Sequence, residues 1–152
     1  MLLVLIVICG GSFFAFWLFR KRENDKRIRA LQLADIDSMN GIDFEKYVAK
    51  LLEHKGFQVR VTKASGDLGV DVIAEKSPIK YSVQVKRQSD PVSRRAVSDA
   101  VAGKMHYNCN TAMVVTNAYF TPGAKELAHS TRCELIDRQA LAQWILDFQN
   151  KK

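Results

Sequence analysis

The sequence contains few of the residues that mark several large protein classes. Only 3 proline and 8 glycine residues occur among 152, which excludes collagen-like and low-complexity chains. The 3 cysteine residues lack the spacing of a zinc ligand set, so neither a disulfide framework nor a cysteine-based zinc site is indicated, and a reducing compartment fits best. With 47% hydrophobic and 26% charged residues, the composition is typical of one globular domain with accessory segments.

Acidic residues are also fewer than basic residues. The chain has 16 acidic and 23 basic side chains and a net charge of +7. A polyanionic partner is therefore favoured, either nucleic acid or an anionic membrane surface. Charge alone does not choose between the two.

The first 19 residues contain no charged side chain. As a helix, residues 1–19 would be about 28 Å long, close to the ~30 Å thickness of the hydrocarbon core of a bilayer. Basic residues follow this stretch instead of preceding it, which favours an uncleaved membrane anchor over a signal peptide. We therefore expect one transmembrane helix at residues 1–19, through which the protein contacts the lipid bilayer.

The segment after the apolar stretch is basic. Residues 20–29 carry a net charge of +4, and by the positive-inside tendency this keeps the C-terminal part in the cytoplasm. The expected location is the cell inner (cytoplasmic) membrane, single-pass, with the main domain facing the cytoplasm. A solvated juxtamembrane helix is an alternative interpretation of the same charges and is compatible with this topology. We divide the chain into a transmembrane helix (1–19), a basic juxtamembrane linker (20–38) and a domain (39–152).

The domain has the alternating pattern of an α/β fold. Asp43 to Lys55 places apolar residues on one helix face, and Gly56 provides the stop. Runs of alternating or continuous apolar residues predict strands, and Thr121-Pro122 and Asp137 are helix-start signals. This order implies a mixed central sheet flanked by helices. The expected elements are a helix at 43–55, strands at 57–61, 70–74 and 81–86, a helix at 92–105, a strand at 112–116, a helix from Thr121, a strand at 133–136 and a helix after Asp137.

Polar residues that could carry chemistry occur on the second and third predicted strands. Asp71 lies in an apolar stretch, where an unpaired carboxylate would be costly to bury. Gln84 and Lys86 are two residues apart and therefore share one face, which a hairpin would bring beside Asp71. The simplest interpretation is an Asp71–Lys86 salt bridge.

The functional alternative is a metal site at the same three residues. Carboxylate and amide oxygens suit Mg²⁺, which takes one or two carboxylates together with substrate phosphate. Lys86 would then position the attacking water or stabilise the charge that develops on the phosphate. The residue pattern by itself leaves both interpretations open.

Several separated motifs resemble one known family. Together they resemble the catalytic domain of Mrr-like, type IV-type restriction endonucleases of the PD-(D/E)xK nuclease superfamily, and the resemblance covers roughly Ile42 to Ile145. The resemblance implies a restriction endonuclease-like fold and Mg²⁺-dependent hydrolysis of DNA phosphodiester bonds. The motifs are SGDLGVDVIA (65–74), VQVKR (83–87), VSRRAV (92–97) and VVTNAYFT (114–121).

The resemblance also implies roles for individual residues. Asp71, Gln84 and Glu45 match metal ligands, and Lys86 completes the catalytic set. Gln84 replaces the second acidic residue of the wider superfamily, which is the usual form in the Mrr-like branch. Without the resemblance, Glu45 would be interpreted as an ordinary glutamate near a helix N-terminus.

DNA binding is expected from basic residues close in sequence to this site. Residues 39–152 carry a net charge of +5, enough for salt-sensitive phosphate contacts without base readout. The candidates for phosphate contacts are Lys63, Arg87, Arg94 and Arg95.

The sequence therefore supports a membrane-anchored, Mg²⁺-dependent endodeoxyribonuclease, with restriction of foreign DNA as one role and a homodimer as one assembly. One alternative is a catalytically inactive, membrane-tethered module that binds nucleic acid. Another is a domain whose polar trio is only structural and whose basic face meets anionic lipid.

Overall fold

The computed structural model describes residues 16, 19–20, 33–62 and 69–150 of the chain. Most of the predicted transmembrane helix (1–19) and of the predicted linker (20–38) lies outside these residues, as does Lys63. Within the described ranges, no helix combines the length and apolarity needed to cross a membrane.

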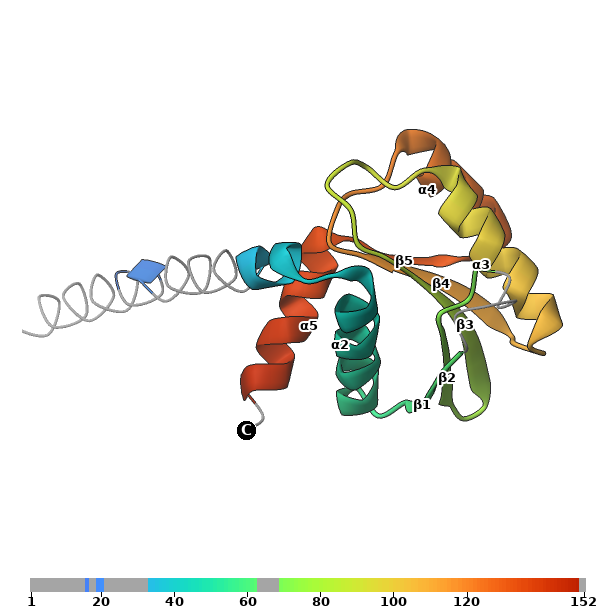
Figure 1. The fold of residues 1–152 in the computed structure, drawn as a ribbon, viewed down its shortest axis with the longest axis horizontal. Helices are drawn as coiled ribbons and strands as arrows, with labels where there is room; N and C mark the ends of the chain where they lie inside the picture. The colour runs from blue at the N-terminus through green and yellow to red at the C-terminus, as the bar shows by residue number, and fades with distance from the viewer. Residues whose placement is uncertain (1–15, 17–18, 21–32, 63–68, 151–152) are drawn as a thin grey trace, which may run out of the picture.

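A five-stranded mixed sheet forms the centre of the domain (Figure 1). The strand order in space follows the order in sequence, with β1, β2 and β3 antiparallel and β3, β4 and β5 parallel. This confirms the predicted α/β class with a mixed sheet. The strands are β1 (Gln58–Val61), β2 (Val72–Lys76), β3 (Ile79–Lys86), β4 (Thr111–Thr116) and β5 (Glu134–Ile136).

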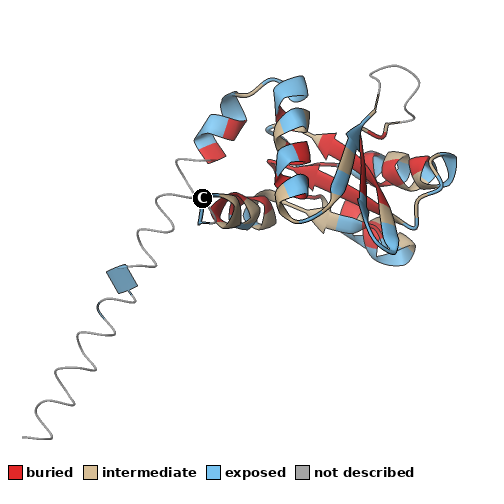
Figure 2. Cartoon of the chain, turned by 90° about the horizontal axis from the view of Figure 1, so that it is seen from below, coloured by how far each residue is buried: buried red, intermediate tan, exposed pale blue. Residues whose placement is uncertain are grey.

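Helices α2 (Gly41–His54) and α5 (Arg138–Asn150) cover one face of the sheet (Figure 1). The larger apolar core lies between these helices and the strands, as the buried residues in Figure 2 indicate. Val83 and Val85 of β3 point into this core. Because side chains alternate along a strand, Ser82, Gln84 and Lys86 point to the opposite face.

Helices α3 (Arg94–His106) and α4 (Pro122–Thr131) cover that opposite face and enclose a second, smaller core. Ser82 fixes α3 to β3, since its Oγ donates a hydrogen bond of 2.8 Å to the Ala100 carbonyl. Further along, α3 approaches the sheet closely at Gly103. A Cβ added there would lie 2.0 Å from Val70 Cγ2, so only glycine allows this contact.

The helices begin and end at residues that the sequence marks. Asn40 and Thr121 cap α2 and α4 by accepting hydrogen bonds from the amides of Asp43 and Ala124, at 2.9 and 3.2 Å. The Asp137 side chain does the same for the first turn of α5, at 3.0 Å. These contacts confirm the starts predicted at Thr121 and Asp137.

Residues 33–38, which fall in the predicted linker, form a helical segment that packs on the domain. Leu33 and Ile36 are buried, at 9% and 2% exposure, in the same core as α2. The folded unit therefore includes these residues as well as the domain predicted from residue 39.

The strand limits differ from the sequence-based expectation by one or two residues, and the differences at β2 and β3 bear on the site. β2 begins at Val72 and not at residue 70, so Asp71 lies just before the strand and not within it. Its backbone amide still donates a hydrogen bond of 2.9 Å to the Val83 carbonyl. The hairpin turn between β2 and β3 is shorter than expected and contains a cis Ser77–Pro78 peptide.

Candidate active site

Asp71 and Gln84 form a hydrogen-bonded pair at the start of β2. Val72 is paired with Val83 in the antiparallel ladder, so Asp71 lies beside Gln84. Asp71 Oδ2 accepts hydrogen bonds from Gln84 Nε2 at 2.7 Å and from the Val85 amide at 2.6 Å. The predicted convergence of the aspartate and the glutamine is confirmed.

Lys86 ends β3 on the same face as Gln84, and it is half-buried. The hydrogen bonds to Asp71 Oδ2 come from Gln84 and Val85, and the Asp71–Lys86 salt bridge that the sequence favoured stays a prediction. Lys86 lines a cavity of about 340 Å³. The other residues that line it are Gln88, Pro91, Val92, Ser93, Arg95, Ala96 and Asp99.

Glu45 lies in α2 and is half-buried. The segment before α2 is fixed to the carboxyl ends of β3 and β4 through Asp37, which contacts Arg87 and Asn117. Since α2 begins four residues after Asp37, the helix that carries Glu45 starts close to these strand ends. Its role as a metal ligand stays a prediction.

The described basic candidates are all exposed but differ in their surroundings. Arg94 and Arg95 occupy the first turn of α3, which contains no acidic residue. Arg95 lines the cavity of Lys86. Arg87 donates a hydrogen bond of 2.9 Å to the Asp37 carbonyl, and its charge helps to lower the pKa of the Asp37 carboxyl group.

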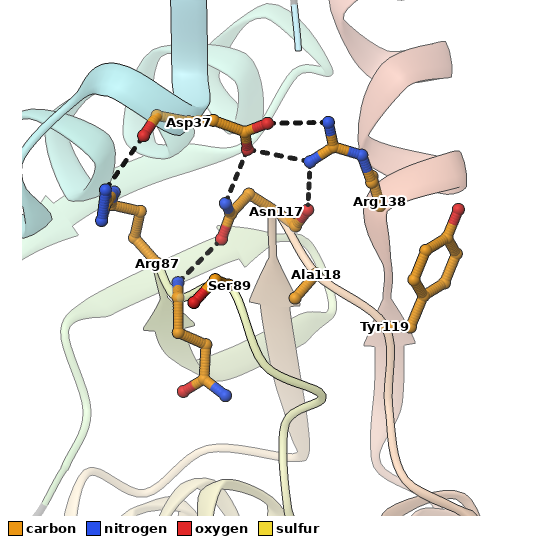
Figure 3. Close-up of a pocket in the computed structure, with 8 residues that line it drawn as sticks. Asp37, Arg87, Ser89, Asn117, Ala118, Tyr119 and Arg138 are labelled. Carbon is orange, nitrogen blue, oxygen red and sulfur yellow. Dashed lines mark hydrogen bonds and ion pairs between the residues drawn. The ribbon is translucent and has the colours of Figure 1, made fainter. Parts of the chain in front are cut away.

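A second cavity, of about 410 Å³, opens beside the carboxyl ends of β3 and β4 (Figure 3). Asp37 is its central acidic residue and accepts two hydrogen bonds of 2.8 Å from Arg138, one on each carboxylate oxygen. Asn117 donates to the same carboxylate at 2.8 Å and accepts from the Gln88 amide at 2.9 Å. This network ties the helical segment at 33–38 to the strand ends next to Lys86.

The same contacts shift the protonation of both charged groups. The hydrogen bonds from Arg138 lower the pKa of Asp37 below its ordinary value, although partial burial opposes this, and the hydrogen bonds to Asp37 raise the pKa of Arg138. A carboxyl group whose pKa is lower in the folded chain stabilises the fold above its unfolded pKa. That contribution disappears as the pH falls through the folded pKa.

Replacing Asp37 by asparagine is therefore expected to lower the free energy of unfolding at neutral pH by roughly 1 kcal/mol, since a partly exposed pair is screened by solvent. The side chain of Asp37 is 40% exposed. The difference between the two proteins should shrink below about pH 4, where the carboxyl group becomes protonated. Urea unfolding at neutral and acidic pH measures this difference in the free energy of unfolding. A difference that does not change with pH would show that the charge has no part in the effect.

Four residues near the site escape prediction from the sequence, namely Asp37, Asn117, Arg138 and Asp99. Asp37 lies 80 residues from Asn117 and 101 from Arg138, so no local pattern connects them. Asp99 lies on α3 between helical neighbours that face the sheet, and its closeness to Gln84 depends on how α3 packs. The sequence did contain one signal for this packing, because small residues at 96, 100 and 103 lie on one face of the helix and allow a close approach to the sheet.

The donor chemistry of the site fits a hard divalent cation. Gln84 is 1% exposed, and its Oε1 is buried without a hydrogen-bond partner. An amide oxygen next to a carboxylate is an appropriate ligand for Mg²⁺. Within the described residues, no group of three or more His, Cys, Asp and Glu side chains is arranged to hold a metal ion. Any cation here would therefore depend on amide oxygen as well as on carboxylate.

Comparison with known proteins decides the family. The family model Mrr_cat, described as restriction endonuclease, matches residues 36–145, which is most of the chain. The chain belongs to this family. An Mrr_cat domain implies a DNA hydrolase, in agreement with the motifs in the sequence, and the match begins within the helical segment at 33–38. The search of curated proteins finds no match.

Solved structures share the fold of this Mrr_cat domain at low identity. The modification-dependent restriction endonuclease AspBHI matches with a TM-score of 0.61 and 17% identity, over 80% of this chain and 36% of its own. The restriction endonuclease MspJI, crystallised with a 27-mer oligonucleotide, matches with a TM-score of 0.57 and 17% identity, over 80% of this chain and 31% of its own. AF1548, a protein of unknown function, matches with a TM-score of 0.53 and 22% identity, over 61% of this chain and 55% of its own. The chain thus spans about a third to a half of these proteins.

Proposed function

We propose that this chain is a Mg²⁺-dependent endodeoxyribonuclease that hydrolyses phosphodiester bonds in DNA. The observation that carries the proposal is the Asp71–Gln84 pair, with a buried amide oxygen that lacks a partner, two residues from a lysine that opens on a cavity. Membership of the Mrr_cat family supports the reaction class.

The proposed role of each site residue follows from its chemistry. Asp71, the Oε1 of Gln84 and Glu45 would hold the cation, and each offers an oxygen atom of the kind that Mg²⁺ prefers. When bound, Mg²⁺ polarises a phosphoryl oxygen and acidifies a bound water. The ammonium group of Lys86 stabilises the negative charge that grows on the phosphate as water attacks.

The DNA backbone would lie along the first turn of α3. Ser93 is the N-cap of α3, and its side chain makes no capping hydrogen bond. Together with Arg95 it lines the cavity of Lys86, and a helix N-terminus without acidic residues is a favourable place for a phosphate. Arg94, Arg87 and Lys63 would add contacts to flanking phosphates. This mode of binding is salt-sensitive and independent of base sequence.

We further propose that residues 1–19 anchor this domain at the cytoplasmic face of the cell's inner membrane, where it would restrict foreign DNA that enters. The support is the uncharged apolar stretch and the net charge of +4 in residues 20–29. Two copies could form a homodimer there, which stays a prediction from the sequence.

Cleavage of supercoiled plasmid by the full chain in detergent micelles tests the nuclease. Methylated and unmethylated plasmid are each incubated with Mg²⁺ or with EDTA, beside a folded Asp71→Asn protein that keeps the side-chain shape. We expect nicking with Mg²⁺ only, and a loss of at least about 100-fold in the variant, because the ligand charge is gone.

Equal cleavage by the wild type and the Asp71→Asn protein would reject the proposed site. Absence of cleavage by every form, combined with DNA binding that weakens steeply in salt, would favour the membrane-tethered binding module. Binding to anionic liposomes without affinity for DNA would support the third, structural alternative.

A further inference from the structure

Gly69, Gln84 and Asp99 border one small space on the α3 side of the sheet. Gly69 has a positive φ of 76°, and a Cβ added to it would lie 2.8 Å from Gln84 Oε1 and 2.9 Å from Asp99 Cβ. The amide oxygen and the aspartate side chain therefore approach the same point. The absence of a side chain at residue 69 keeps that point open.

The amide oxygen in this space lacks a donor. Gln84 Nε2 donates to Asp71 Oδ2, which turns Oε1 away from that bond. Oε1 is buried without a hydrogen-bond partner, a state that costs roughly 1–3 kcal/mol for a neutral polar group. The space at Gly69 thus has the unpartnered Gln84 Oε1 on one side and the side chain of Asp99 on the other, with Asp99 Cγ 3.4 Å from the added Cβ position, and a cation with its bound waters would supply what the amide oxygen lacks.

The position of Asp99 is fixed by the packing of α3. Its neighbour Ala100 accepts the hydrogen bond from Ser82 on β3. One helical turn from Asp99, the close approach of Gly103 to Val70 holds α3 over the residues that lead into β2. Asp99 is half-buried and lines the same cavity as Lys86.

We propose that Asp99 is an additional ligand of the cation site, which it completes together with Asp71 and Gln84 Oε1. This inference rests on the proposed nuclease function and assigns to its metal centre a carboxylate beyond Asp71 and Glu45. Gln84 is an amide, so it adds an oxygen ligand to the site but no negative charge. Asp99 supplies that charge from the helix facing the strand, either to the cation or to one of its bound waters.

Binding of Mn²⁺ tests this assignment without relying on cleavage. Mn²⁺ prefers the same oxygen ligands as Mg²⁺, and the free ion is quantified by its electron paramagnetic resonance signal. The full chain in micelles is titrated as wild type, Asp99→Asn and Asp71→Asn. Glu126→Gln serves as the matched control, since Glu126 is an exposed carboxylate on α4 away from the site. Thermal unfolding without metal verifies that each protein is folded.

We expect Asp99→Asn to weaken Mn²⁺ binding by roughly 10- to 100-fold, and Glu126→Gln to leave it unchanged. Wild-type affinity in Asp99→Asn, with a loss in Asp71→Asn, would overturn the role of Asp99 and leave the proposed nuclease intact. Lack of Mn²⁺ binding by the wild type would overturn both.

A second variant separates metal binding from a contact between Asp99 and Lys86, which line the same cavity. The effect of Asp99→Asn is measured again in a Lys86→Met background. A loss of Mn²⁺ affinity that persists supports the direct role. A loss that vanishes when Lys86 is absent would overturn it, because Asp99 would then act through the lysine.

Discussion

Replacing Lys86 by methionine is expected to lower the rate of plasmid cleavage at least about 100-fold, the usual cost of removing one group that stabilises charge in a transition state. The lysine is half-buried at the end of β3, and methionine keeps the unbranched apolar stem. The hydrogen bonds that Asp71 Oδ2 accepts come from Gln84 and Val85, so the Asp71–Gln84 pair should survive the change. The stability of the fold and the binding of Mn²⁺ should therefore stay close to the wild type.

Single-turnover cleavage with excess protein measures this rate, and the salt dependence of DNA binding is measured alongside it. The slope of affinity against salt concentration should decrease by about one charge if Lys86 contacts a phosphate. Lys125→Met on α4 is the control, because Lys125 is exposed and away from the cavity. Wild-type cleavage by Lys86→Met would remove the lysine from the proposed mechanism.

Much of the fold follows from patterns that are local in the sequence. The helix around residues 43–55 is marked by apolar spacing and by Gly56, whose φ of 88° fits the predicted stop. The pairing of Asp71 with Gln84 follows from the alternation of side chains in a short hairpin. These features are predictable because each depends on residues close together in the chain.

The remaining features depend on packing between distant segments. Asp37 reaches Asn117 and Arg138 only after the sheet has brought the ends of β4 and α5 together. Asp99 reaches Gly69 because α3 lies close to the sheet at Gly103. The hydrogen bonds that Asp71 Oδ2 accepts from the Val85 amide and the Gln84 amide likewise depend on the exact register of the hairpin. Spacing alone gave no means to rank these donors.

Replacing Phe44 by alanine is expected to lower the free energy of unfolding by about 3–5 kcal/mol, because a fully buried aromatic side chain leaves a cavity that the core only partly refills. Phe44 is 0% exposed and belongs to the core that joins α2 to the sheet. Since a domain of this kind is stable by about 5–15 kcal/mol, much of the total would be lost.

Ile42→Ala provides the control on the same helix. Ile42 is 63% exposed, so its truncation should change the free energy of unfolding by less than about 0.5 kcal/mol. Urea unfolding in micelles compares the two proteins. Equal, small effects would mean that α2 contributes little to the core of the protein in solution. A large effect of Phe44→Ala alone would establish that the helix carrying Glu45 is held in place by its buried face, so a loss of activity in that variant would reflect a displaced α2 as well as lower stability.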